Sequence, residues 1–320
     1  MKRAIIFGIN GQDGKLLSEI LLKKNYEIIG THYKKIKKKI NFKFVKINIL
    51  DFVGVKKIIN KYNPNEIYNF TGISDLKSNE EDFFYSEKIN NLAVVNILDT
   101  IKNTKIKFFQ PITSEIYGNY KYSKKIKLNT PFNPSSSYAI SKLSSLFYIR
   151  MYREKFNVHC VAGIFFNHES EYRKNKFVTK MIVENLNKIN LKKSGQLIIN
   201  NLSAKRDWGY AKDYMEIAYK ALNYKKPNDY LIGNGKLYSV KDIVNIASKY
   251  YGIKLKWKTV GKNIFGVDHK NKKIVKSPVN KNFKFKSIYA DNSEIKKLFK
   301  YKASKNFKEL IELICSYEKK

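Results

Sequence analysis

Short apolar runs alternate with segments of helical periodicity through the first half of the chain. The apolar runs predict buried strands at 4–7, 26–31, 42–47, 66–70, 107–110 and 158–165. The segments between them repeat apolar residues every three or four positions and predict helices at 16–22, 55–62, 89–101 and 135–156. Parallel strands need a crossover between them, usually a helix. This order therefore predicts an α/β fold, a doubly wound parallel sheet with helices on both faces.

The alternation of predicted strands and helices becomes irregular after about residue 166. Short strands and helices are expected there among aromatic and lysine-rich loops, notably at 257–286, and two helices should close the chain, starting near 291–293 and near Ser304. We expect a first domain over 1–166, with a later return of the chain to it at roughly 205–235. A smaller lobe should take up most of 167–320.

A glycine-rich loop follows the first predicted strand, since residues 8–14 have the sequence GINGQDG. Glycines three apart, between a strand and a helix, let backbone N–H groups and the helix N-terminus approach a pyrophosphate closely. The alternative is a tight turn without a ligand. We favour a dinucleotide site of the Rossmann type. The second strand ends in Thr31, His32, Tyr33 and Lys34, with no acid to hold a ribose 2′-hydroxyl, which favours NADP over NAD.

A tyrosine and a lysine, Tyr138 and Lys142, lie four residues apart on a predicted helix and so share one face. An ammonium beside a phenol favours the phenolate, so we expect a lowered tyrosine pKa and a base that can accept a hydroxyl proton. Thr113, Ser114 and Glu115 follow the fifth strand, at the sheet edge where such folds place their site. A glutamate there suits removal of a proton next to a carbonyl. The alternative is a capping Ser114 beside a solvated Glu115.

The charge of the chain is strongly positive. Lys and Arg number 63 against 27 Asp and Glu, a formal net charge of +36, yet only five of the basic residues are arginine. The lysines are spread over nearly every segment and form no single stripe. We interpret them as a solvated surface that attracts anions, and we expect no nucleic-acid partner.

No segment of the sequence predicts a membrane anchor. Apolar runs stay shorter than the roughly 18 residues that span a bilayer. The run behind Lys2 and Arg3 ends at Phe7, which argues against a signal peptide. Two distant cysteines, Cys160 and Cys315, fit a reducing compartment, although one bridge between them stays open. We expect a cytoplasmic protein with no membrane partner.

Long stretches of the chain resemble one family, the GDP-mannose 4,6-dehydratases, which are extended short-chain dehydrogenases/reductases. The loop GINGQDG resembles the family's GxxGQDG. The stretch TSEIYG at 113–118 resembles TSELYG, and FNHES at 166–170 followed by FVT at 177–179 matches the family. The stretch AKRDWGYAKDY at 204–214 is similar to AKRDWGHAKDY. The resemblance covers nearly the whole chain.

This resemblance implies an enzyme, a hydro-lyase that uses NADP and a nucleotide-sugar substrate. Tyr138 would deprotonate the C4 hydroxyl of the sugar, Glu115 would remove the C5 proton, and Glu115 with Thr113 would help water leave from C6. Lys142 would bind the nicotinamide ribose and tune Tyr138. The product would be a 4-keto-6-deoxy sugar nucleotide.

The family's functional residues carry over as follows. Catalysis falls to Thr113, Glu115, Tyr138 and Lys142. Cofactor contacts fall to Gly8, Asn10, Gly11, Gln12, Asp13, Gly14, Lys34, Asn48, Ile49, Thr71, Gly72, Ser74, Tyr85, Lys142, His168 and Arg173. Substrate contacts fall to Ser114, Asn167, Val178, Lys180, Arg206 and Lys281. No metal site is expected. Tyr85 could instead be a packing aromatic and His168 a satisfied loop histidine.

The chain also departs from the family's pattern. Asn48 replaces an aspartate, and Lys281-Asn282-Phe283-Lys284 stands where the family has an Arg-Pro-x-Glu motif that grips the nucleotide. The segment between the second and third strands, which joins subunits in family tetramers, is shorter here, so we expect a homodimer, with a tetramer possible. The nucleotide and sugar stay open: GDP-mannose, a GDP-heptose or another nucleotide's hexose. A 4-epimerase or 4-keto reductase on the same fold is the alternative reaction, and a binding protein without catalysis is a third.

Overall fold

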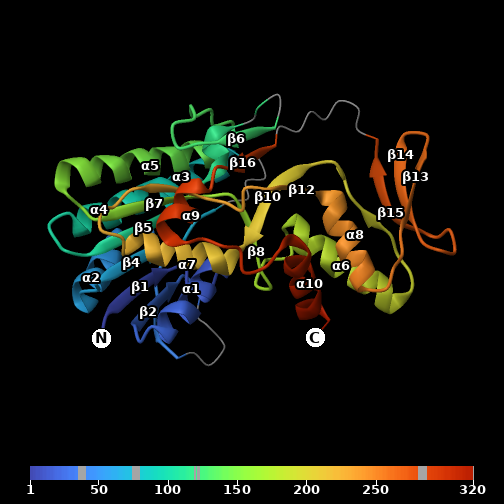
Figure 1. The fold of residues 1–320 in the computed structure, drawn as a ribbon. Coiled ribbons are helices and arrows are strands. Elements are labelled where there is room, and N and C mark those ends of the chain that lie inside the picture. Colours follow the sequence, from blue (N-terminus) through green and yellow to red (C-terminus); the bar gives the residue numbers. More distant parts are fainter. Residues whose placement is uncertain (35–40, 74–79, 119, 121–122, 280–286, 320) are drawn as a thin grey trace.

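The parallel sheet predicted from the apolar runs is present. The computed structural model describes residues 1–34, 41–73, 80–118, 120, 123–279 and 287–319. Within them, seven strands form one sheet in the order β11-β7-β5-β4-β1-β2-β3, and each neighbouring pair is parallel (Figure 1). The strands are β1 (Arg3–Phe7), β2 (Glu27–His32), β3 (Lys43–Lys46), β4 (Glu66–Asn69), β5 (Lys107–Thr113), β7 (Cys160–Phe165) and β11 (Asp229–Ile232).

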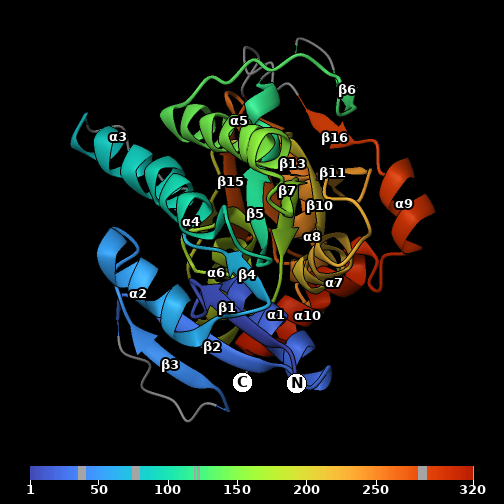
Figure 2. The same cartoon turned by 90° about the vertical axis from the view of Figure 1, so that its left-hand side faces the viewer.

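Helices cover both faces of this sheet (Figure 2). Successive side chains of a strand point to opposite faces. Thus Ile5 and Phe7 of β1 pack in one buried cluster and Ala4 and Ile6 in another. The first cluster includes side chains of α2 (Phe52–Tyr62), α4 (Ala93–Ile101) and α5 (Ser137–Phe156). The second includes side chains of α1 (Gln12–Lys23), α7 (Ala211–Leu222) and α9 (Ser293–Phe299).

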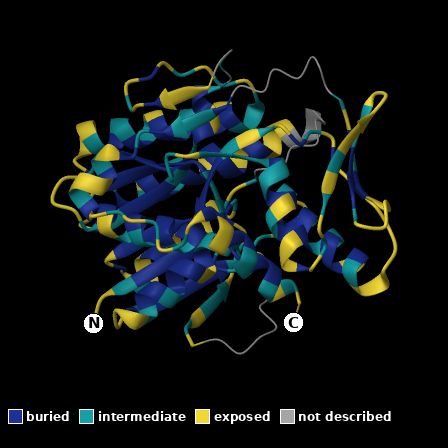
Figure 3. Cartoon of the chain, turned by 45° about the vertical axis from the view of Figure 1, so that its right-hand side comes forward, coloured by how far each residue is buried: buried dark blue, intermediate teal, exposed yellow. Residues whose placement is uncertain are grey.

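A third buried cluster lies in the lobe beside the sheet. Helices α6 (Val178–Lys192), α8 (Val240–Tyr250) and α10 (Phe307–Glu318) pack there around Trp208 and Val275. Smaller sheets flank it: β8 (Asn167–Glu169), β10 (Lys205–Tyr210) and β12 (Leu237–Ser239), then β9 (Leu197–Ile198), β13 (Lys256–Val260), β14 (Asn263–Val267) and β15 (Lys273–Pro278). β6 (Lys124–Ile126) pairs with β16 (Ile288–Ala290). Figure 3 shows buried residues concentrated in the large sheet, whereas β13 at the edge of the lobe is mostly exposed.

Two elements differ from the sequence prediction in ways that matter for the site. β5 runs three residues further than expected and carries Thr113 to its end. The helix expected at 89–101 continues from α3 (Glu80–Glu87) through a π-helical turn, η1 (Lys88–Leu92), into α4. In that turn the buried Asn90 side chain binds both the N–H and the carbonyl of Ile73, at 3.1 and 3.0 Å. The π turn thus holds the loop that follows β4.

Three findings on membrane helices, metal ligands and cysteines apply to the residues that the structure describes. No helix there is long and apolar enough to cross a membrane. No cluster of His, Cys, Asp and Glu there could hold a metal ion. Cys160 and Cys315 are free thiols, and both are buried.

Candidate active site

A cavity of about 640 Å³ lies at the carboxyl ends of the sheet strands, between the sheet and the lobe. Its lining comes from the loop after β4, the end of β5, the start of α5 and the segment after β7. The lining residues are Asp13, Phe70, Thr71, Gly72, Pro111, Ile112, Thr113, Ser114, Glu115, Gly118, Ser135, Ser136, Tyr138, Lys142, Phe165, Phe166, Asn167, His168, Arg173, Phe177, Arg206 and Ile288. The four predicted catalytic residues therefore face one space.

The end of β5 positions Thr113 and Glu115. The Thr113 side chain accepts a hydrogen bond from the Glu115 backbone N–H at 3.3 Å and so caps the 3₁₀ turn η2 (Ser114–Tyr117). This cap directs Glu115 into the cavity. A hydrogen bond also joins Thr113 to the Tyr138 side chain. Helix α5 starts at Ser137 because the Ser136 side chain caps it, accepting the Ala139 N–H at 3.1 Å.

The predicted lowering of the Tyr138 pKa is wrong for this structure. Burial raises the pKa of Tyr138, the Glu115 carboxylate raises it further, and the hydrogen bond with Thr113 and the charge of Arg173 lower it only in part. Lys142 shares the helix face, but its Nζ donates to the Pro111 carbonyl at 3.1 Å. The physical reason for the error is that sequence spacing places a charge on a face but does not reveal burial.

Lys142 itself is buried, with 4% of the residue exposed. Burial lowers its pKa to about 8, because an ammonium loses solvation there. Its neighbour Gly72 lies so close that an added Cβ would be 3.6 Å from the Lys142 Nζ. Lys142 thus lies between the loop after β4 and the end of β5, at the floor of the cavity.

The carboxylate of Glu115 and the guanidinium of Arg206 interact electrostatically across the cavity. Glu115 is an exposed residue of η2, but the partial desolvation of its carboxyl group raises the pKa of Glu115, and the guanidinium of Arg206 lowers it. Burial likewise lowers the pKa of Arg206, and Glu115 raises it. A carboxyl group with a raised pKa gives up and accepts protons closer to neutral pH than an ordinary glutamate does.

The glycine loop has the close packing expected of a phosphate cradle. Gly8 has φ +79°, and an added Cβ would lie 2.8 Å from the Phe70 carbonyl carbon. At Gly14 an added Cβ would lie 2.6 Å from the Gly8 oxygen. Gly11 precedes α1 and has no side chain to cap it, which leaves the first-turn N–H groups facing a potential anion.

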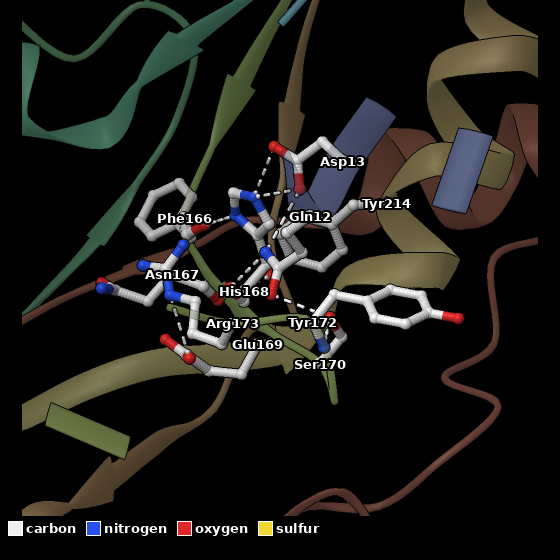
Figure 4. A network of polar contacts seen from close by, with 10 residues as sticks. All are labelled: Gln12, Asp13, Phe166, Asn167, His168, Glu169, Ser170, Tyr172, Arg173 and Tyr214. Carbon is white, nitrogen blue, oxygen red and sulfur yellow. Dashed lines mark hydrogen bonds and ion pairs between the residues drawn. The ribbon is translucent and has the colours of Figure 1, made fainter. Parts of the chain in front are cut away.

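The segment at 166–170 is hydrogen-bonded to this loop (Figure 4). Both Asp13 carboxylate oxygens lie 3.2 Å from the His168 Nε2. The Ser170 hydroxyl donates to the Gln12 Oε1 at 2.9 Å, and the Gln12 Nε2 donates to the His168 carbonyl at 3.2 Å. Nearby, Arg173 forms an ion pair with the buried Glu169 at 3.2 Å.

Several predicted cofactor residues that the structure describes lie outside the lining of this cavity. The Lys34 Nζ lies 5.3 Å from the centre of the Tyr33 ring. The Asn48 side chain accepts the Leu50 N–H at 3.0 Å, and Ile49 is buried in the first cluster. Tyr85 is 46% exposed on α3. Asn10 belongs to the glycine loop but does not line the cavity, and Ser74 lies outside the described residues.

The predicted substrate residues divide between two cavities. A second one, of about 350 Å³, adjoins the first, and Asn167 and Arg206 line both. Val178 lines the second and Ser114 the first. Lys180 lines neither, because it is 3% exposed and its ammonium pairs with Glu318 of α10. Lys281 lies outside the described residues.

Some lining residues were missed from the sequence. Met181 and Trp208 line the second cavity and Phe177 the first, where the Arg173 guanidinium lies 3.5 Å from the centre of its ring. Met181 was detectable, since it lies three residues after Val178 and so on the same face of α6. Phe177 and Trp208 lie in the stretches 177–179 and 204–214 that resemble the family, but no role was predicted for either residue.

A doubly wound sheet with a glycine loop and a Tyr–Lys pair that lines the cavity at its edge is the arrangement of an extended short-chain dehydrogenase/reductase. A family model described as GDP-mannose 4,6 dehydratase matches residues 5–314. The chain belongs to this family, and it is therefore an enzyme.

Curated relatives agree with the family model. The GDP-mannose 4,6 dehydratase of Drosophila melanogaster is 34% identical over 84% of this chain and 73% of its own. That of Dictyostelium discoideum is 31% identical over 97% and 94%. The human protein of the same name is 35% identical over 82% and 76%.

Solved structures confirm the fold. The Thermus thermophilus UDP-glucose 4-epimerase in complex with NAD has a TM-score of 0.81, at 17% identity and 99% coverage of both chains. The Bacillus anthracis dTDP-glucose 4,6-dehydratase in complex with NAD has a TM-score of 0.80, at 18% identity, covering 100% of this chain and 97% of that one.

Proposed function

We propose that this enzyme is an NADP-dependent sugar-nucleotide 4,6-dehydratase that converts GDP-mannose to GDP-4-keto-6-deoxymannose. The observation that carries the proposal is Glu115 in the same cavity as Thr113, Tyr138 and Lys142. Oxidation of an alcohol needs the tyrosine and the lysine only. A carboxyl group beside them supplies the further proton transfers that eliminating water requires. The names of the curated relatives support this reaction and this substrate.

The residues of the cleft fit a nicotinamide dinucleotide. The glycine loop leaves no room for a Cβ at Gly8 and Gly14, and the uncapped first turn of α1 suits a pyrophosphate. We favour NADP because β2 ends at His32 and continues into Tyr33 and Lys34, without the acid that binds a ribose 2′-hydroxyl. When bound, the nicotinamide would accept the hydride from C4 and return it to C6.

The proton transfers fall to the chain's own side chains. Tyr138 would accept the C4 hydroxyl proton while C4 is oxidised to a ketone, and because its pKa is raised it must first lose its own proton to do so. Since that ketone acidifies C5, Glu115 would accept the C5 proton and deliver it to the C6 hydroxyl, which leaves as water. Thr113 would donate a hydrogen bond to the substrate oxygen. C5 finally regains a proton, and this is balanced by the proton that Tyr138 took from the C4 hydroxyl. The net change in the substrate is therefore the loss of one water.

We place the sugar over the first cavity and the nucleotide toward the second. Arg206 and Asn167 line both cavities, and a guanidinium suits a diphosphate through paired hydrogen bonds. Val178, Met181 and Trp208 give the second cavity an apolar wall for a base. We accordingly keep the division into a dinucleotide domain over 1–166, with a return at 205–235, and a substrate lobe over 167–320.

Two other activities are compatible with part of what is observed. A dehydratase for a related sugar nucleotide would use the same catalytic residues, and the Lys281–Lys284 departure bears on that choice of nucleotide. A 4-epimerase or 4-keto reductase is favoured only by the shared fold of the solved epimerase. Neither of those reactions needs Glu115. Incubation with GDP-mannose and NADP⁺, followed by product mass, separates them: only dehydration removes one water.

We further propose a cytoplasmic homodimer. Helix α5 exposes two apolar residues, Ile140 at 50% and Phe147 at 52%. Leu92, in the π-helical turn η1 that contacts α5, is 42% exposed. Such a face suits a second copy of the same chain. Sedimentation equilibrium measures the mass directly. A dimer mass supports the proposal, and a Phe147→Glu variant should then shift toward monomer.

A further inference from the structure

A half-buried charged pair joins the glycine loop to strand β8. The Asp13 carboxylate meets His168 through both of its oxygens, and Gln12 and Ser170 make a second, uncharged link beside it (Figure 4). His168 is paired in turn with Gly209 of β10, between Asn167 and Glu169. A residue of the cofactor loop is thus bound to the strand that carries the substrate-facing Asn167.

The hydrogen-bond geometry indicates the charge state of His168. Its Nδ1 lies 2.9 Å from the Phe166 carbonyl oxygen, and its Nε2 lies 3.2 Å from both Asp13 oxygens. A carbonyl and a carboxylate can only accept, so both ring nitrogens must carry hydrogen. This arrangement favours the imidazolium form of the ring. Burial lowers the pKa of His168, but the charge and hydrogen bonds of Asp13 outweigh this and raise it overall.

Other charged or titratable groups face this pair. They include Arg173, which lowers the pKa of His168, and Glu169, whose own pKa is raised by burial but lowered by the charge of His168. Tyr214 of α7 has its ring centre 5.2 Å from that of the imidazole, and the charge of Asp13 raises the pKa of Tyr138 of α5. Burial raises the pKa of Asp13, but His168 outweighs that and the pKa is lowered overall. The carboxylate is therefore ionised at neutral pH, beside the proposed pyrophosphate site. Without the imidazolium, its negative charge would be compensated less, because the more weakly acting Arg173 would remain.

We propose that His168 is a positioning residue whose imidazolium holds and neutralises Asp13, so that the glycine loop's affinity for the dinucleotide follows the protonation of His168. The proposal rests on the proposed function only in assuming that the loop binds a dinucleotide. Its new content is that His168 acts through Asp13. Two consequences follow, one for pH and one for substitutions.

Cofactor affinity should be highest below the raised pKa of His168 and should fall as pH rises through it. Loss of one proton limits the change to roughly tenfold in Kd per pH unit. Lys142 titrates in the same range, since burial lowers its pKa to about 8. The slope due to His168 must therefore be isolated by substitution.

The experiment is calorimetric titration of NADP⁺ and of NAD⁺ into the purified enzyme at about pH 6 to about pH 9. This range lies above the roughly pH 5 to 8 of ordinary histidines because the pKa of His168 is raised. His168→Gln keeps an N–H toward Asp13 and removes the charge. We expect the wild-type Kd to rise about tenfold or more over this range, and the His168→Gln slope to be clearly shallower. Ser170→Ala, the matched control, removes the uncharged link. It should weaken binding at every pH by a similar factor and keep the slope.

Asp13→Asn provides a second, independent variant, with thermal denaturation used to confirm that each protein is folded. It should flatten the pH dependence as His168→Gln does, because no carboxylate is left to compensate. Equal slopes in wild type and His168→Gln overturn the positioning role while leaving the dehydratase proposal intact. A wild-type enzyme that binds neither dinucleotide at any pH overturns both.

Discussion

Substituting Glu115 with glutamine tests the residue that separates a dehydratase from its relatives in fold. Glutamine keeps the length and hydrogen-bonding reach of the side chain but cannot accept the C5 proton. Glu115 lies in the η2 turn, and only its backbone N–H takes part in the Thr113 cap, so the substitution should leave the local fold intact. A general base contributes a factor of about 10² to 10⁴ to rate. We expect product formation to fall by that factor.

The same variant should still carry out the first oxidation. Tyr138 and Lys142 are unchanged, so C4 should be oxidised and the reduced nicotinamide should accumulate. Glu115 raises the pKa of Tyr138, and removing its charge should lower that pKa. The first phase should therefore reach its maximal rate at a lower pH than in wild type. Stopped-flow absorbance of the reduced nicotinamide measures both its amplitude and its pH profile.

Glu184→Gln is the matched control, since it makes the same substitution on α6, where Glu184 pairs with Lys188 at 2.7 Å and does not line the cavity. It should turn over normally. Unimpaired product formation by Glu115→Gln would remove Glu115 from the mechanism. A loss of the first phase as well would show that Glu115 acts in oxidation rather than in elimination.

Three further predictions concern other residues. Tyr138→Phe should abolish hydride transfer, so substrate deuterated at C4 should give no reduced, labelled cofactor; normal transfer would exclude Tyr138 as the base. Arg206→Lys keeps the charge but loses the paired geometry, and steady-state kinetics should show KM raised roughly tenfold with kcat changed less; an unchanged KM would contradict the diphosphate contact. Asp207 is 1% exposed, and burial raises its pKa from 3.8 to about 6, against the lowering effect of backbone N–H donors including those of Ala290 and Gly235. The folded state thus binds this proton more tightly than the unfolded state, so stability should fall by up to about 3 kcal/mol as pH rises from 3.8 to about 6. Urea denaturation should show a smaller fall in Asp207→Asn, and an equal fall would show that Asp207 is not its source.

The sequence predicted the architecture because its signals are local. Buried parallel strands appear as continuous apolar runs, and Ala4 to Phe7 supply side chains to both helical layers. The convergence of Thr113, Glu115, Tyr138 and Lys142 was predictable for a related reason. The carboxyl ends of parallel strands meet at one edge, and the tyrosine and lysine lie on the first turns of a helix beside it.

The parts that sequence reasoning missed depend on contacts between distant segments. Asp13 and His168 are 155 residues apart in sequence, and no spacing rule predicts that they meet. Lys180 follows the family's FVT segment, yet it pairs with Glu318 in the last helix. The pKa of Tyr138 is raised chiefly by burial and further by the charge of Glu115, neither of which its spacing from Lys142 reveals. Such properties arise only once the lobe packs against the sheet.

The central claim is tested most directly by incubating the purified enzyme with NADP⁺ and a panel of GDP-, CDP-, UDP- and dTDP-sugars and following product mass. The account predicts that GDP-mannose loses the mass of one water. The same loss from a different sugar nucleotide would keep the role of Glu115 and change the substrate. If none of the sugars loses water while the enzyme binds its cofactor, the dehydratase mechanism is contradicted.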